Sequence, residues 1–188
     1  MSATDTQAQA IPTGTWTADT VHSSVGFEVP YAVATFSGEV REFEASLEDG
    51  TIKGAAKIAT LQTKDENLQA HLLSPEFFDA ERNPEVTFSG SEIKRDGDKV
   101  EIPGEITIKG ISQPTTLKGI TQPVILEGSI VGPAVDHFGK TRVGLKLETT
   151  IDRTKFDMNW NMPLPNGEPA LSNDVTLKAD LTLVAQEA

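Results

Sequence analysis

The residue types of a hydrolytic triad occur together near the N-terminus, as Asp19, His22 and Ser23. No G-x-S-x-G motif surrounds the serine, and no second histidine–carboxylate pair is present to orient a base. Aspartate and serine at such a position bond readily to nearby backbone amides. We therefore interpret these residues as a turn that leads into a strand, and we predict no catalytic residues.

The remaining motifs for metal, thiol or nucleotide chemistry are missing. The histidines His22, His71 and His137 show neither H-x-H nor H-E-x-x-H spacing, and the chain has no cysteine. No glycine-rich loop joins a strand to a helix in a phosphate-binding pattern. The sequence therefore predicts no metal site, no disulfide and no nucleotide cofactor.

The charge of the chain limits its partners. Its 188 residues include 16 basic and 28 acidic ones, a net charge of −12. A nucleic-acid binder needs basic residues to neutralise phosphates, and anionic lipid headgroups would repel this chain. The longest apolar run, 31–34, is too short for an integral membrane segment or a secretory signal. We therefore expect no nucleic-acid partner and a cytoplasmic location.

Apolar residues occur at every second position along most of the chain. Between Val100 and Ile108 the even positions are apolar or glycine, and the odd positions are mostly polar. This alternation predicts antiparallel strands with one buried face. The same pattern predicts strands at 25–33, 52–58, 143–147 and 175–183, and a weaker form of it at 38–48, 85–94 and 115–130. Tight turns are predicted at Asp49-Gly50 and Asp96-Gly97.

One segment departs from this alternation. Thr63-Lys64-Asp65-Glu66 has the form of a capping box and predicts a short helix between the third and fourth expected strands. Ser74-Pro75-Glu76 predicts the start of a second helical turn. A further helical turn is expected at Asp152–Asp157.

These elements predict an all-β fold of eight antiparallel strands. Residues 1–13 are expected to be a disordered lead-in, and residues 14–188 a single domain. Eight such strands form either a closed barrel or a two-sheet sandwich. We favour the barrel with a helical lid, because small residues are interspersed with Phe, Ile and Leu on the predicted inner face, which fits a barrel that holds one small ligand.

Four sequence blocks carry a family resemblance. The run Trp16–Val29 with Asp19, His22 and Phe27 closely resembles the opening motif of the YceI-like family of polyisoprenoid-binding proteins. The other blocks agree in order and spacing: His71–Phe88, Gly104–Pro114, and Ile151–Phe156 with Asn173-Asp174-Val175.

The resemblance implies a lipocalin-like, eight-stranded barrel whose long apolar cavity takes up a polyisoprenoid chain. It also implies binding rather than turnover. The chain departs from the family pattern at Pro30-Tyr31, where a histidine is common, at Leu73, where a basic residue is common, and at Asp157, where glycine is usual. The first two departures remove polar groups that could contact a headgroup.

From the pattern and the resemblance, we predict a non-enzymatic carrier or sequestering protein for one long-chain apolar lipid. The alternatives are an enzyme that acts on a lipid in the barrel through His22 or Tyr31, and a dry β-sandwich that binds partners through an edge strand. Homodimer formation stays open. We expect ligand contacts from Phe27, Val29, Tyr31, Val33, Leu72, Phe77, Phe78, Phe88, Ile106, Ile108, Leu145, Leu147 and Trp160.

Overall fold

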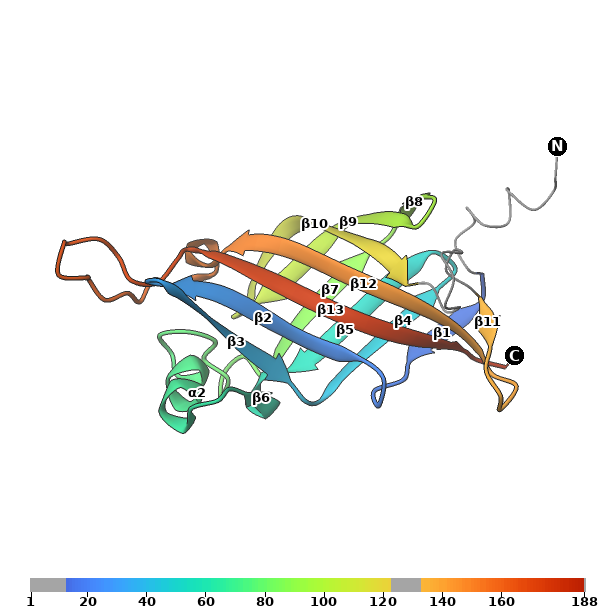
Figure 1. The fold of residues 1–188 in the computed structure, drawn as a ribbon, viewed down its shortest axis with the longest axis horizontal. Helices are drawn as coiled ribbons and strands as arrows, with labels where there is room; N and C mark the ends of the chain where they lie inside the picture. Colours follow the sequence, from blue (N-terminus) through green and yellow to red (C-terminus); the bar gives the residue numbers. More distant parts are fainter. Residues whose placement is uncertain (1–12, 123–132, 188) are drawn as a thin grey trace.

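The computed structural model describes residues 13–122 and 133–187, drawn in colour in Figure 1. Most of these residues lie in strands. The strands are β1 (Thr15–Ala18), β2 (Ser24–Tyr31), β3 (Ala34–Val40), β4 (Phe43–Glu48), β5 (Thr51–Lys57), β6 (Leu61–Gln62), β7 (Glu85–Gly90), β8 (Lys94–Asp96), β9 (Lys99–Ile108), β10 (Ile111–Gln122), β11 (Ala134–Val135), β12 (Thr141–Asp152) and β13 (Asp174–Ala185). The helices are the 3₁₀ turns η1 (Ile58–Thr60) and η2 (Arg153–Phe156) and the α-helix α2 (Glu66–Leu73).

The strands close into an antiparallel barrel of eight strands. The pairing runs β12-β10-β9-β7-β5-β4-β1-β13, and β12 also pairs with β13 along its whole length, from Arg142↔Val184 to Asp152↔Asp174. Strands β1 and β2 pair with successive stretches of the same edge of β13. On their other side, β1 pairs with β4 and β2 pairs with β3. The barrel is therefore confirmed, and the sandwich alternative is wrong because the pairing closes on itself.

The strand boundaries differ from the expected ones in physically simple ways. The expected strand 38–48 is divided into β3 and β4 at Arg41 and Glu42. The expected strand 25–33 ends at Tyr31, because a tight turn follows with Ala32 in the left-handed region (φ 51°). The short strands β6, β8 and β11 carry too few residues for alternation to reveal them. Part of the expected strand 115–130, and residues 1–12 of the expected lead-in, lie outside the described residues.

The helix begins two residues later than the expected capping box. Asp65 is the N-cap and accepts a bond of 2.8 Å from the Leu68 amide, whereas the Thr63 hydroxyl donates to the Asp65 carbonyl. A second hydrogen-bonded turn does follow at residues 75–78, where the Phe77 amide donates to the Ser74 carbonyl at 3.0 Å. The Ser74 side chain does not cap this turn, because Ser74 caps the C-terminus of α2 and its hydroxyl donates to the His71 carbonyl. In chain order α2 lies between β6 and β7, and therefore between the segments expected as strands 52–58 and 85–94.

Other local predictions are confirmed. The helical turn expected at Asp152–Asp157 is η2, with the Asp152 carboxylate accepting from the Thr154 amide. Asp157 follows in the left-handed region, with φ 58°, which explains why glycine suits this position. The predicted turns at Asp49-Gly50 and Asp96-Gly97 connect β4 to β5 and β8 to β9.

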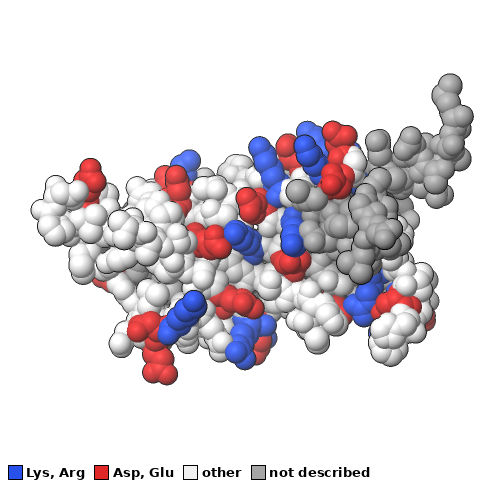
Figure 2. Space-filling model, in the orientation of Figure 1, with Lys and Arg blue, Asp and Glu red and all other residues white. Residues whose placement is uncertain are grey.

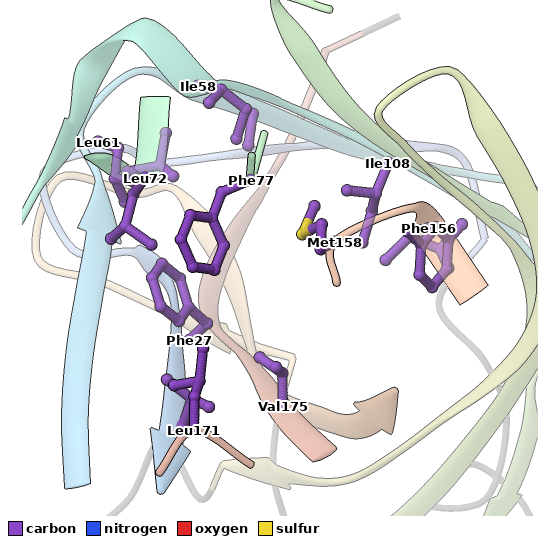
Figure 3. Close-up of a cluster of buried hydrophobic side chains, with 14 residues drawn as sticks. Phe27, Ile58, Leu61, Leu72, Phe77, Ile108, Phe156, Met158, Leu171 and Val175 are labelled. Atoms are coloured by element: carbon purple, nitrogen blue, oxygen red, sulfur yellow. The ribbon is translucent and has the colours of Figure 1, made fainter. Parts of the chain in front are cut away.

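The buried core consists of two clusters. The helix-end cluster comprises Phe27, Val29, Val40, Ala56, Ile58, Leu61, Leu72, Phe77, Ile106, Ile108, Phe156, Met158, Leu171 and Val175. The terminal-end cluster comprises Trp16, Leu47, Ile52, Val100, Ile102, Val143, Leu145, Leu147, Leu181 and Leu183. Figure 3 shows Phe27, Leu72 and Phe77 pointing toward one another, so the helix segment closes onto the barrel interior. None of the described helices is long and apolar enough to cross a membrane.

Candidate functional site

An apolar cavity lies inside the barrel between the two core clusters. Its volume is about 150 Å³. Val25, Phe43 and Phe88 border it, and all three are only partly buried and pack against both clusters. The barrel interior is therefore continuous from one cluster to the other, and it is least tightly filled at its middle.

Alternation keeps charged groups out of this interior. Glu44, Lys53 and Lys178 border the cavity region, but each alternates along its strand with inward-facing residues. Their side chains therefore point outward, and the Lys178 ammonium lies 3.0 Å from the Glu28 carboxylate on the outer face. The cavity presents apolar surface to any ligand.

A hydroxyl pair lies on the inward face further along the barrel. Thr115 of β10 and Thr149 of β12 approach to 3.2 Å, and Thr149 also donates to the Thr116 carbonyl at 3.2 Å. Both side chains are partly buried, and each hydroxyl has a partner. This pair can accept or donate one more hydrogen bond without placing a charge in the barrel.

Glycine makes room for an aromatic ring beside the cavity. Gly38 of β3 lies directly opposite Phe27 of β2, and a Cβ at Gly38 would lie 2.6 Å from the Phe27 ring. The Phe27 ring instead packs edge-on against Phe36, with centroids 6.2 Å apart, and near Phe78 at 6.0 Å. A larger residue at position 38 would displace the ring that forms one wall of the cavity.

An aromatic cluster closes the helix end of the barrel. The His71 ring lies edge-on to Phe77 at 4.9 Å and to Trp160 at 4.6 Å, and its Nε2 donates to the Glu76 carboxylate. Lys109, in the turn between β9 and β10, donates bonds of 2.7 Å to the carbonyls of Pro75 and Asp157. These bonds fasten the segment after α2 to η2 across the end of the barrel.

Six of the expected ligand contacts line the cavity. They are Phe27, Phe78, Phe88, Ile106, Ile108 and Leu147. Five others lie in the surrounding core: Val29, Leu72 and Phe77 are buried in the helix-end cluster, Leu145 is buried in the terminal-end cluster, and Trp160 packs against the helix-end cluster.

Two expected lining residues are outside the barrel. Tyr31 is 38% exposed and Val33 is fully exposed. The expectation that they line the interior is wrong, because β2 leaves the barrel wall at its end and turns at Ala32 and Val33 into β3. Tyr31 is the last residue of β2, and Val33 lies two residues beyond the end of the strand.

The structure also adds lining residues that the sequence did not single out. They are Val25, Val40, Phe43, Ala45, Ile52, Gly54, Ala56, Ile58, Val86, Leu117, Leu177, Ala179 and Leu181. All lie on the inward face of strands or beside it. Only the closed ring of strands shows which of them meet at the middle of the barrel.

Two of the triad-like residues, Asp19 and His22, belong to a polar network on the surface with Arg142, whereas the Ser23 hydroxyl accepts a bond from the Thr182 amide. His22 is 64% exposed, and its Nδ1 lies 2.9 Å from the Asp19 carboxylate, which in turn lies 2.7 Å from Arg142. Hydrogen bonds from Arg142 and His22 hold the pKa of Asp19 well below its usual value. Arg142 also pairs with Asp136 and lowers its pKa to about 2. His22 thus lies outside the cavity, and the proposed cavity acid or base at His22 is wrong.

A larger hollow of about 1460 Å³ runs along the outer face of the barrel. Two ion pairs border it: Lys146 and Asp180 lie 3.9 Å apart, and Lys178 and Glu28 lie 3.0 Å apart. Figure 2 shows basic and acidic groups interspersed along this side of the molecule. Such a mixed-charge surface is solvated by water and offers little apolar contact area for a lipid chain.

A closed antiparallel barrel with an apolar interior defines a class of small barrel proteins whose interior can hold one ligand. The chain matches the YceI-like domain over residues 16–183 and belongs to the YceI-like family. The resemblance seen in the four sequence blocks is thereby confirmed. Among curated relatives, the UPF0312 protein plu2095 of Photorhabdus laumondii is 27% identical over 149 residues, covering 75% of this chain and 73% of that protein.

Solved structures share the fold. BcnA of Burkholderia cenocepacia aligns with a TM-score of 0.70 at 19% identity, covering 90% of this chain and 99% of that chain. A polyisoprenoid binding domain from Saccharophagus degradans aligns with a TM-score of 0.67 at 9% identity, covering 91% of this chain and 98% of that chain. At these identities the likeness establishes the fold.

Proposed function

We propose that the protein binds one long apolar chain of the polyisoprenoid class inside the barrel and carries or sequesters it. The observation that carries this proposal is the apolar cavity between the two core clusters, which is bordered by partly buried Val25, Phe43 and Phe88. The family and the description of the Saccharophagus degradans domain as polyisoprenoid binding support the same ligand class.

The size of the cavity determines how such a ligand must bind. A core cavity of about 150 Å³ in another protein holds a benzene molecule. A longer chain therefore requires the two clusters to separate around the middle of the barrel. The rings of Phe43, Phe78 and Phe88 are the side chains to move, because they are only partly buried where they border the cavity.

Burial of the ligand supplies the driving force. About 20 isoprenoid carbons at roughly 0.8 kcal/mol each give a gross gain above 10 kcal/mol. Ordering of the chain and rearrangement of the rings reduce this gain. No charged residue is needed for affinity, and the Thr115–Thr149 pair provides a neutral hydrogen-bonding point for a polar end group.

Gly54 provides a direct test of the interior site. It faces inward between Ala45 and Phe88, and a Cβ there would meet only the Glu44 carbonyl oxygen, at 3.7 Å. The variant Gly54→Leu therefore fills the cavity without a backbone clash. We expect it to lose uptake of a farnesyl- or geranylgeranyl-chain alcohol by at least tenfold, measured by native mass spectrometry after incubation with the lipid.

Ala55→Leu is the matched control, because residue 55 alternates with residue 54 and its side chain points to the outer face. We expect this variant to retain uptake. A wild-type protein that takes up no prenyl chain, or a Gly54→Leu variant that binds as well as Ala55→Leu, would contradict binding inside the barrel.

A further inference from the structure

Two loops form an exposed apolar tip at the helix end of the molecule. One is the turn of the β2–β3 hairpin, residues 30–35, and the other is the loop 159–170 between η2 and β13. Val33 is fully exposed, Met162 is 51% exposed and Tyr31 is 38% exposed. Figure 1 shows the hairpin end and the loop together at one end of the barrel, with the end of β13 at the other.

Backbone bonds join the two loops into one unit. The Ala32 amide donates to the Ala170 carbonyl at 2.7 Å, and the Ser172 amide donates to the Pro30 carbonyl at 3.0 Å. Within the long loop, the Asn161 side chain accepts from the Leu171 amide and donates to its carbonyl. The apolar side chains are thus held in place on a braced scaffold, which lowers the entropy lost when they bind a surface.

The tip is almost free of charge. Residues 29–38 contain no charged residue and residues 158–173 contain only Glu168, although 23% of the whole chain is charged. Figure 2 shows this end as mostly white, in contrast to the mixed charges along the barrel wall. A protein partner that recognised this end by ion pairs would find one carboxylate to pair with.

The tip is continuous with the barrel interior. Phe27, Val29 and Tyr31 share one face of β2, and Phe27 and Val29 are buried in the helix-end cluster. The same row of side chains therefore leads from the cavity wall at Phe27 to the exposed ring of Tyr31. Tyrosine with an apolar ring and a polar hydroxyl suits the boundary between lipid headgroups and acyl chains.

We propose that this tip inserts into the surface of a lipid bilayer with zwitterionic headgroups. The occupant is a bilayer because the tip offers exposed apolar side chains without charges, and it is not an anionic bilayer because the net charge of −12 opposes approach. Its purpose rests on the proposed function, since a docked tip places the barrel end against the lipid phase that would hold an apolar ligand.

Vesicle flotation without ligand tests the docking. Wild-type protein is mixed with phosphatidylcholine vesicles, or with phosphatidylglycerol vesicles at low salt. We expect association with the former and weaker association with the latter. The variant Val33→Asp should lower the partition coefficient on phosphatidylcholine at least tenfold, because it places a charge at the insertion point.

Val21→Asp is the matched control, since Val21 is 84% exposed in the connection between β1 and β2. It adds the same charge away from the tip and should leave the partition coefficient unchanged. Equal behaviour of the two variants, or no association of the wild type with phosphatidylcholine, overturns the proposal. Dimerisation that Val33→Asp abolishes, without vesicle association, also overturns it and assigns the tip to a second copy.

Uptake of a prenyl alcohol from cyclodextrin, with no membrane present, separates the two proposals. Val33→Asp should bind the alcohol as the wild type does, because residue 33 lies outside the cavity. If vesicle association persists while no variant or wild type takes up the alcohol, the interior ligand is wrong and the docking tip stands.

Discussion

At the scale of single residues, Arg153 shows how a buried charge can be held by backbone carbonyls. Its side chain is buried, and its guanidinium donates to the carbonyls of Met158 at 2.6 Å, Trp160 at 2.8 Å and Ser172 at 2.8 Å. Burial lowers its pKa. The planar fork of donors suits several carbonyls at once, so arginine fastens the base of the loop that carries the apolar tip.

The Arg142 network predicts an acid-dependent loss of stability. The folded state holds the pKa of Asp136 at about 2, below its ordinary value of 3.8, and lowers that of Asp19 as well. A carboxyl with a lowered pKa stabilises the folded state above its unfolded pKa, and this contribution is lost as the pH falls from 3.8 toward 2. The urea midpoint should therefore decline in this window.

The variant Arg142→Met should flatten that decline, because both carboxyls then return toward their ordinary pKa values. Lys146→Met is the control, since Lys146 lies on the same strand and is half-exposed, 3.9 Å from Asp180. Urea titrations at several pH values between 5 and 2 measure the effect. The same slope in Arg142→Met and wild type would show that the network does not control acid stability.

At the scale of elements, the sequence predicted the strands well and the ends of elements less well. Alternation located the strands that became β2, β5, β9, β12 and β13, because one face of each meets the interior. It could not locate β6 or β11, which are too short to show a period. It also could not show that β2 ends before Val33, because the chain keeps apolar residues beyond the strand.

The sequence predicted that the candidate site is an apolar barrel interior, but it identified only some of the residues that line the cavity. Inward-facing Phe27, Phe88 and Ile106 were identified because they lie in strong alternating runs. Phe43 and Leu117 were missed because their strands alternate weakly in sequence, and their place at the cavity depends on the closure of the whole ring of strands. The closure of the barrel decides which residues meet at the cavity. No local sequence pattern shows this closure.

We predict that the two hydrogen bonds of Lys109, which join the segment after α2 to the end of η2, slow the entry of ligand. Lys109→Met removes the bonds to the Pro75 and Asp157 carbonyls and should cost about 1–3 kcal/mol of stability. It should also speed prenyl-alcohol uptake, because the segment after α2 is released from η2. Stopped-flow uptake monitored by tryptophan fluorescence measures this. Lys140→Met, in the loop before β12, is the control.

At the scale of the whole molecule, barrel closure and ligand capacity oppose each other. Tight packing of the two clusters stabilises the empty barrel, whereas a long ligand must separate them.

Gly54→Leu should therefore unfold at higher urea than wild type without ligand, because it fills space and removes a flexible glycine worth about 0.5–1 kcal/mol. A ligand at 100 times the wild-type Kd should stabilise wild type by about 2.7 kcal/mol, and Gly54→Leu by no more than about 1.4 kcal/mol, because the variant is expected to bind at least tenfold more weakly. Urea unfolding with and without prenyl alcohol measures both effects. If ligand stabilises both proteins equally, the ligand binds outside the cavity, and the barrel interior is a core rather than a container.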